Sequence, residues 1–275
     1  MKRSIEFIGL PGAGKTTIEN LIRKELLRNG YLVFSARNLL VNKAVQRRLM
    51  GFMGHIWYRL ERASNNRFTA ISKGLEEELF RRFRQEFPEY VDYCYQLIRN
   101  SKATIGRQEV MEKWLKKEGG AWIAFEECKD LNWVYLNDEG FLHRALGYFS
   151  EVEISPEAIN EYCRLCPQHE WVILVSTSPD TALTRLKLRN DHVLRNIDEI
   201  SNRAPFEKMR KYCEILDSIF GALPIGTVGR LVNEECEAHS TSEAVLTLLS
   251  KIGLDSFRRV EHEQQKGTDL FSSGK

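Results

Sequence analysis

Long apolar runs are missing from this sequence of 275 residues. No run approaches the roughly 18 consecutive apolar residues of a membrane-spanning helix, so we expect no membrane segment. The short apolar stretch after Lys2 and Arg3 soon reaches glycines and Lys15, which predicts a strand and a loop and not a secretion signal. Net charge is also nearly absent, at +2. That balance is far from the charge of a typical nucleic-acid binder, so nucleic acid is not expected as a partner.

Cysteine is scarce, with six residues in the chain. Without a secretion signal, this number predicts reduced thiols and a cytoplasmic protein. Cys163 and Cys166 form a C-x-x-C pair with His169 nearby. The sequence has no second pair or well-spaced histidine that would complete four zinc ligands. The pattern therefore favours ordinary helix thiols over a metal site.

Strand and helix signals alternate near the N-terminus. Apolar residues fall at helical spacing from Lys15 to Asn29, between two short apolar runs typical of strands. Ser178 and Pro179 predict another helix start, as N-cap and first helical residue, and a last helix is predicted over Ser242–Ile252. We predict strands at 4–9, 31–36, 133–137, 171–177 and 227–233. The expected fold is α/β, with a mainly parallel five-stranded sheet flanked by helices.

The stretch 37–118 shows no clear strand, and its apolar spacing predicts helices at 75–87, 90–99 and 109–117. Lys and Arg outnumber Asp and Glu here. A basic helical cap could attract phosphorylated ligands, although solvated helix faces explain most of the individual residues more simply. We expect one domain over 1–256, with 37–118 as a helical insertion after the second strand that binds the acceptor. The polar residues 257–275 are expected to form a flexible tail.

The segment "GLPGAGKT" matches the pattern G-x-x-x-x-G-K-[ST] known as Walker A. Small residues let backbone N–H groups turn inward around a phosphate, and the helix that follows adds its positive N-terminal end. Lys15 would neutralise the outer phosphates, and Thr16 would offer a hydroxyl to Mg²⁺. The motif follows a predicted strand and opens a predicted helix, as this chemistry requires. We therefore expect ATP bound by Gly9, Pro11, Gly12, Ala13, Gly14, Lys15, Thr16 and Thr17.

The chain resembles the P-loop nucleoside and nucleotide kinases, in particular the thymidylate kinase-like and deoxynucleoside kinase-like branch. "IEFIGLPGAGKTT" looks like their first strand and phosphate loop, and "VYLNDEGFLHR" like their third core strand with its terminal acid. "ILVSTSPDTALTRLKLRN" is similar to their fourth strand and the helix before an arginine-rich lid. "TVGRLVNEECEAHSTSEAV" resembles their closing strand and last helix. The resemblance implies a P-loop fold with ATP and Mg²⁺ as cofactors, and a small-molecule phosphate acceptor.

The resemblance also implies roles for several arginines. Arg185 and Arg189 lie one helical turn apart and would close on the phosphates, with Arg195 in the loop beyond them. Arg37 matches a position that contacts the acceptor, and Arg144 is a further candidate for substrate binding. His143 is expected to be structural. The sequence leaves open whether the protein forms a homodimer.

The adjacent carboxylates Asp138 and Glu139 allow three interpretations. A kinase with a hydroxyl acceptor would use a carboxylate as the base. A kinase with a phosphate acceptor needs no base, and Asp138 would then order Mg²⁺. A P-loop ATPase of the motor type would use Asp138 for Mg²⁺ and Glu139 to activate water. Because residues alternate faces along a strand, we expect Asp138 to be the essential carboxylate and Glu139 to be secondary.

Three alternatives to a small-molecule kinase stay open. The predicted arginine lid favours a kinase, which must exclude water from the acceptor, over a P-loop ATPase that is not a kinase. A 5′-hydroxyl polynucleotide kinase could use "RRFR" (Arg81–Arg84) and the basic insertion to hold a strand. A regulatory module would bind nucleotide without turnover. The sequence as a whole predicts an ATP-dependent kinase acting on a nucleoside, a nucleotide or a similar metabolite.

Overall fold

A five-stranded parallel sheet forms the centre of the computed structural model. Its strand order is β2-β3-β1-β4-β5, and every neighbouring pair runs parallel. The strands are β1 (Arg3–Ile8), β2 (Leu32–Phe34), β3 (Trp133–Asn137), β4 (Trp171–Ser176) and β5 (Val228–Val232). The structure describes residues 3–36, 38–40, 69–128, 133–153, 155–188, 204–224, 228–233 and 238–254. The predicted parallel α/β sheet is thus confirmed.

The central strands are apolar on both faces. Ile5, Phe7 and Ile8 of β1 are fully buried, and all five residues of β3 are buried. Continuous burial is expected for parallel strands, because helices cover both faces of such a sheet. β2 lies at an edge, where Leu32 is 51% exposed. A charged residue, Glu6, is fully buried among these apolar side chains of β1.

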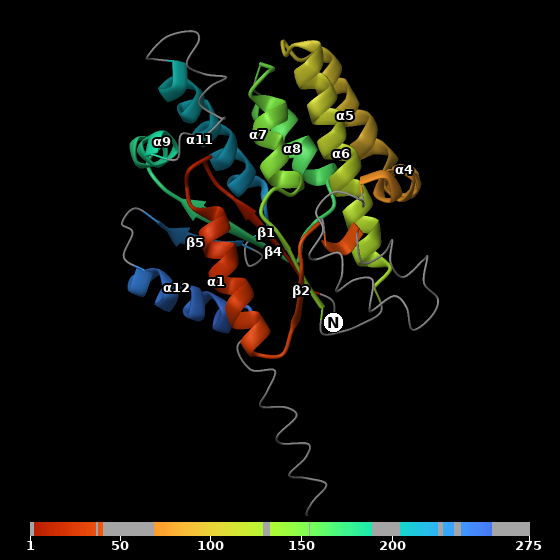
Figure 1. The fold of residues 1–275 in the computed structure, drawn as a ribbon. Coiled ribbons are helices and arrows are strands. Elements are labelled where there is room, and N and C mark those ends of the chain that lie inside the picture. The colour runs from red at the N-terminus through yellow and green to blue at the C-terminus, as the bar shows by residue number, and fades with distance from the viewer. Residues whose placement is uncertain are drawn as a thin grey trace, which may run out of the picture.

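Helices cover the sheet on two sides (Figure 1). α1 (Lys15–Arg28) and α12 (Ala238–Lys251) pack against each other, and α12 also contacts β5. α7 (Phe141–Phe149) contacts β1 and packs against α11 (Ala204–Ala222), which also contacts α8 (Pro156–Leu165) and α9 (Pro179–Leu188). Within the described ranges, no helix has the length and apolar character needed to cross a membrane.

The described part of the predicted insertion is helical. It contains α4 (Thr69–Glu86), α5 (Pro88–Asn100) and α6 (Ile105–Glu126). α6 is longer than the predicted helix over 109–117, because it continues through two glycines into a buried apolar stretch that ends at Phe125. The Ser178 hydroxyl accepts the Thr181 N–H at 3.2 Å, which confirms the predicted helix start at Pro179. α7, α8 and α11 were not predicted, and the boundaries 1–256 and 37–118 stay predictions.

The insertion joins the core through an aromatic contact. Phe83 of α4 and Phe141 of α7 are both buried and stack with ring centroids 5.6 Å apart at 5°. Gly119 of α6 makes room for Phe83, because a Cβ there would lie 2.5 Å from the Phe83 ring. α4 and α6 therefore approach closely at a point where no side chain larger than glycine fits.

Gly119→Ala is expected to destabilise the protein by about 1–3 kcal/mol, since the added methyl overlaps Phe83 in a packed core. Gly74→Ala is the matched control, because Gly74 is an exposed residue of α4 with open space around a Cβ. This second change should stabilise the protein by about 0.5–1 kcal/mol through helix propensity. Urea unfolding of both variants measures the difference. Equal effects would contradict the close packing at Gly119.

Candidate active site

The phosphate loop connects β1 to α1 and is held on three sides. Gly9, Gly12 and Gly14 have positive φ values of 152°, 83° and 88°, a conformation that favours glycine. A Cβ on Gly9 would lie 2.4 Å from the Val175 carbonyl oxygen, and one on Gly12 would lie 2.4 Å from that of Ala182. The loop glycines therefore meet two constraints at once, an unusual backbone turn and direct packing on neighbouring backbone.

Asn233, at the end of β5, forms the third contact. Its side-chain Nδ2 donates to the Ala13 carbonyl at 2.7 Å, and its backbone N–H donates to Ser176 at 2.8 Å. A Cβ on Gly14 would lie 2.4 Å from the same Nδ2. Asn233 thus links β4, β5 and the phosphate loop.

Lys15 folds back onto the loop. Its Nζ donates to the carbonyl oxygens of Gly9 and Leu10 at 3.1 and 3.0 Å. Burial lowers the pKa of Lys15 to about 8, and the nearby carboxylates of Glu139 and Asp138 oppose that shift. These backbone carbonyls hold the ammonium beside the position where the loop would place phosphate oxygens.

The two adjacent carboxylates have different partners. The Thr16 hydroxyl lies 3.3 Å from Asp138 Oδ2 and donates to it. Glu139 Oε2 instead accepts from Arg144 Nη2 at 2.6 Å. A threonine hydroxyl and a carboxylate at the mouth of a phosphate loop suit Mg²⁺, which takes one or two protein oxygens alongside phosphate oxygens and water. The described residues fit a Mg²⁺ ion held by Thr16 and Asp138.

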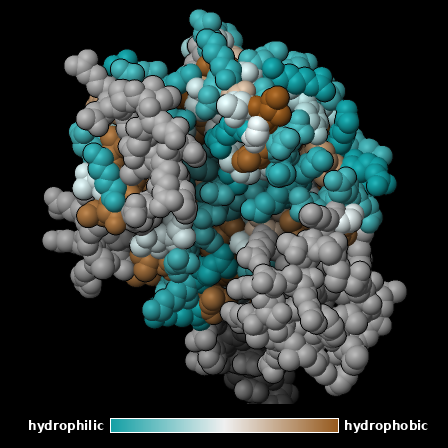
Figure 2. Space-filling view, turned by 45° about the horizontal axis from the view of Figure 1, so that its top comes forward, coloured by the Kyte–Doolittle hydropathy of each residue, from teal (hydrophilic) through white to brown (hydrophobic). Residues whose placement is uncertain are grey.

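A cleft of about 890 Å³ opens beside the phosphate loop. Figure 2, which brings the top of the molecule forward, shows mostly hydrophilic side chains around a hollow in this face. The phosphate loop and the end of β3 form one end of the cleft, while α6, α7 and α11 form its walls. The charged residues lining it are Lys15, Lys102, Arg107, Asp138, Glu139, Arg144, Glu151 and Lys208.

Behind the carboxylate turn lies a second, buried carboxylate. Glu6 of β1 has no exposed surface, and its Oε1 accepts the backbone N–H of His143 at 2.9 Å. A Cβ on Gly140 would lie 2.7 Å from the same oxygen. Burial raises the pKa of Glu6 to about 8, opposed chiefly by the His143 N–H. Glu6 therefore supports the start of α7 directly below Asp138 and Glu139.

Glu6 also faces His169, whose Nε2 lies 3.5 Å from Glu6 Oε2. Both side chains are fully buried. Burial lowers the pKa of His169 to about 3, so its imidazole is neutral. A protonated carboxyl beside a neutral imidazole avoids the cost of burying two charges.

Glu118 of α6 is a further buried carboxylate, with 1% of its surface exposed. It accepts from Asn137 Nδ2 at 3.0 Å, and Arg144 Nη2 lies 3.9 Å away. Burial raises the pKa of Glu118, against the opposing charges of Lys117 and Arg144. Arg144 therefore lies between the exposed carboxylate of Glu139 and the buried one of Glu118.

The predicted site residues fall into four groups. The cleft is lined by the predicted residues Pro11, Gly12, Gly14, Lys15, Thr16, Asp138, Glu139 and Arg144. Arg185 lies in α9, whose Leu186 lines the cleft, but Arg185 itself is not among its described lining residues. Gly9 and Ala13 of the loop and Thr17 of α1 do not line the cleft. Arg37, Arg189 and Arg195 lie outside the described residues.

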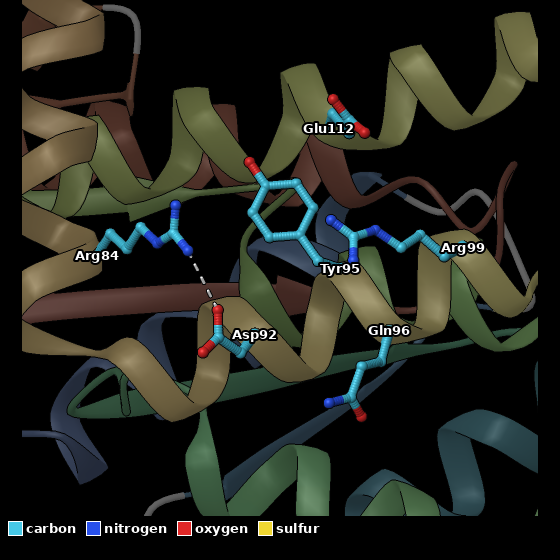
Figure 3. A pocket seen from close by; sticks show the side chains of 6 residues that line it. All are labelled: Arg84, Asp92, Tyr95, Gln96, Arg99 and Glu112. Atoms are coloured by element: carbon cyan, nitrogen blue, oxygen red, sulfur yellow. Dashed lines mark hydrogen bonds and ion pairs between the residues drawn. The ribbon is translucent and has the colours of Figure 1, made fainter.

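A smaller polar hollow lies between α4, α5 and α6 (Figure 3). Arg84 and Arg99 flank Tyr95 there, and Arg84 pairs with Asp92 at 3.5 Å. The "RRFR" segment could have offered an aromatic ring to a nucleic-acid strand, but Phe83 is fully buried. The geometry of this segment therefore favours helix packing over base stacking.

The C-x-x-C cysteines lie in and just after α8, and both are buried. Burial raises the pKa of Cys163 to about 12 and that of Cys166 well above its ordinary range. Across the residues that the structure describes, no group of three or more His, Cys, Asp or Glu side chains could hold a metal ion. These two thiols act as small apolar side chains of the core.

Sequence reasoning missed Glu6, Glu118 and Asn233. Glu6 left a signal, because a glutamate inside an apolar strand buried on both faces needs a partner. Glu118 and Asn233 left none that spacing reveals, since their partners are remote in sequence.

The parallel sheet, the glycine-rich loop between β1 and α1 and the carboxylate after β3 define a P-loop NTPase fold. No protein-family model and no curated protein sequence matches this chain. The similar solved structures include three of deoxyadenosine kinase from M. mycoides. The structure with bound dCTP has 16% sequence identity to this chain and a TM-score of 0.42, and the match covers 90% of this chain and 98% of that chain.

The structure with the products dCMP and dCDP has 17% sequence identity and a TM-score of 0.43, and the match covers 90% of this chain and 99% of that chain. The structure with bound dATP has 15% sequence identity and a TM-score of 0.39, and the match covers 90% of this chain and 99% of that chain. The fold assignment rests on the sheet topology and the phosphate loop of this chain itself.

Glu6→Gln is expected to weaken the pH dependence of stability. The ordinary pKa of this carboxyl is 4.5 and the folded value about 8, so the folded state holds a proton that the unfolded state has released. This stabilisation is full below 4.5 and is lost as pH rises through about 8, with a slope of up to about 1.4 kcal/mol per pH unit. Glutamine keeps the acceptor for His143 and does not titrate.

Urea unfolding between about pH 5 and pH 8 measures the slope. Glu207→Gln is the control, because Glu207 is exposed on α11. The pKa of Glu118 is also raised, so part of the pH dependence of stability should remain in Glu6→Gln. An unchanged slope in Glu6→Gln would show that Glu6 is ionised in the folded protein.

Proposed function

We propose that this protein is an ATP-dependent kinase that phosphorylates a small molecule of the nucleoside, nucleotide or similar metabolite class. One observation carries the proposal: Thr16 Oγ1 and Asp138 Oδ2 meet at 3.3 Å. Both residues line the same cleft as the phosphate loop. A donor phosphate on the loop and an acceptor in the cleft would therefore share one space, as phosphoryl transfer requires.

The loop residues would bind and orient the donor. Lys15 would exchange the carbonyls of Gly9 and Leu10 for phosphate oxygens, which are stronger acceptors because they are charged. Mg²⁺, bound by Thr16 and Asp138, would neutralise phosphate charge. The positive end of α1 lies behind the loop and favours the same anion.

The partners of the carboxylates favour Asp138 as the essential acid. Asp138 faces Thr16, while the Glu139 carboxylate is held by Arg144 at 2.6 Å. A carboxylate oxygen already held by an arginine is less available to accept a proton from a water molecule. This pairing supports a kinase over an ATPase in which Glu139 activates water. Asp138 would accept the proton of a hydroxyl acceptor, or order the ion when the acceptor is a phosphate.

Arginines supply the remaining part of the proposal. Arg185, Arg189 and Arg195 would close over the transferring phosphoryl group, and Arg37 would contact the acceptor. Arg144, which lines the cleft beside Trp114, would complete the acceptor side. Closure by residues of the same chain would exclude water, so that the acceptor and not water receives the phosphoryl group.

A phosphate-transfer screen tests the activity. Nucleosides, nucleotides, sugars and a 5′-hydroxyl oligonucleotide are offered with Mg·ATP, and ADP release is followed in parallel. We expect ADP release that depends on a small-molecule acceptor, and none above background in Lys15→Ala, which should keep its far-UV circular dichroism. ADP release without any acceptor would contradict the kinase proposal and favour an ATPase.

Conservative substitutions distinguish the roles of Asp138 and Glu139. Asp138→Asn should lower kcat about 100-fold or more, because it removes the charge while keeping the shape. Glu139→Gln should lower kcat much less. Steady-state rates with and without acceptor give both values. The reverse order, with Glu139→Gln trapping bound ATP, would identify Glu139 as the residue that activates water.

A further inference from the structure

The far end of the cleft carries positive charge that the described residues do not neutralise. Lys102, Arg107 and Lys208 line this end, which we name the cationic end. Lys208 pairs with Glu151 at 3.7 Å. Within the described chain, the ammonium of Lys102 and the guanidinium of Arg107 have no carboxylate or hydrogen-bond partner. Three cations beside one carboxylate leave a surplus of two positive charges.

Arg107 is held in place without being neutralised. Its guanidinium carbon lies 4.5 Å from the centre of the Trp114 ring, which Arg144 also contacts at 4.4 Å. Trp114 in turn fits against α7 at Gly147, where a Cβ would come within 2.7 Å of the indole. A cation stacked on an aromatic ring keeps its N–H donors available in its plane. Arg107 is therefore oriented, charged and open to a ligand.

Lys102 and Lys208 also act on a neighbouring lysine outside the cleft lining, Lys211. Lys211, one turn along α11 from Lys208, donates to the carbonyls of Ser150 and Val152 at 2.8 and 3.0 Å. Burial lowers the pKa of Lys211, and the charges of Lys102 and Lys208 add to the effect while those of Glu151 and Glu214 oppose it. Positive charge is thus gathered where α7 ends.

α7 sets the distance between the two ends of the cleft. Asp138 and Glu139 precede the first residue of α7, Phe141, while Glu151 follows its last residue, Phe149. Nine helical residues span roughly 13 Å at about 1.5 Å per residue. His143, Leu146 and Gly147 line the cleft between these ends. Arg107 Nη2 would lie 3.7 Å from a Cβ on Gly147, and Lys208 pairs with Glu151 just beyond α7, so the cationic end lies toward the C-terminal end of α7, away from the carboxylate turn.

We infer that the acceptor carries a phosphomonoester that binds Lys102, Arg107 and Lys208, remote from the hydroxyl that Asp138 faces. This inference rests on the proposed kinase activity at the same cleft. A phosphomonoester carries about −1.5 to −2 at pH 7, which matches the surplus charge. The planar fork of Arg107 suits phosphate oxygens. The substrate class is thus a small phosphorylated alcohol, phosphorylated a second time at its free hydroxyl.

Binding of inorganic phosphate tests the subsite without turnover. The full chain is first saturated with Mg²⁺ and a non-hydrolysable ATP analogue, so that the phosphate loop is filled, and phosphate is then titrated by calorimetry. We expect saturable binding that weakens roughly tenfold or more in Arg107→Ala. Arg107→Lys should recover part of the affinity, and acetate should bind less tightly than phosphate. Equal affinity in wild type and Arg107→Ala, or no binding to wild type, overturns the inference.

Lys113→Ala is the matched control for this titration. Lys113 is an exposed residue of the same helix that does not line the cleft. The Lys113→Ala substitution removes one positive charge from α6, as Arg107→Ala does, but at a different place. The phosphate affinity of this variant should therefore stay within twofold of wild type. A loss equal to that of Arg107→Ala would show a general charge effect and would overturn the subsite.

Turnover gives the second test, with acceptor pairs that differ by one phosphate. Ribose is compared with ribose 5-phosphate, and nucleosides with their monophosphates, and the new phosphate is located by ³¹P NMR. We expect transfer to a hydroxyl of the phosphorylated member, with an acceptor KM raised roughly tenfold or more in Arg107→Ala and an unchanged ATP KM. Transfer to a neutral acceptor with the same KM in Arg107→Ala overturns the subsite but not the kinase. Phosphate binding without any transfer would instead overturn the kinase and leave the anion site.

Discussion

Contact between the phosphate loop and its neighbours is the constraint on which the rest of the site depends. Gly9 packs on the backbone of β4, Gly12 on that of α9, and Gly14 on the side chain of Asn233 after β5. In a parallel sheet the carboxyl ends of the strands meet at one edge, and ligands bind there. The loop therefore fixes where β4, β5 and α9 can lie, and the carboxylates after β3 come to the same edge.

The carboxylates at this edge form two layers with different chemistry. Asp138 and Glu139 line the cleft, where Thr16 and Arg144 contact them. Glu6 and Glu118 lie behind them, fully buried, and burial raises the pKa of both. The outer layer can bind cations, whereas the inner layer accepts hydrogen bonds from the His143 N–H and from Asn137. The exposed carboxylates of the site are thus backed by buried carboxyls whose pKa values are raised.

The sequence predicted the parts of the protein that depend on local patterns. All five strands and the phosphate loop follow from apolar runs and glycine spacing, and β3 was predicted to the residue. α7 was missed because its nine residues are fewer than the roughly ten to twelve at which apolar spacing separates a helix from a strand. α6 was predicted too short because two glycines look like a helix end, although here Gly119 admits Phe83 from α4. Asp138 was predicted from its place at a strand end, but the partners of Glu6 and Asn233 come from distant segments. Such pairings depend on how the helices pack, which spacing along the chain does not reveal.

The stack of Phe83 on Phe141 also affects how the molecule moves. Phe83 belongs to the insertion, while Phe141 is the first residue after the turn that holds Asp138. Tyr162 extends the contact by donating to the Phe141 carbonyl at 2.7 Å and meeting Tyr90 at 2.8 Å. Elements that share a buried cluster of this kind open together, so their amide hydrogens exchange with solvent in one cooperative event. The insertion and the carboxylate turn therefore form one unit of local unfolding, and a ligand that orders the insertion would also slow hydrogen exchange at the turn.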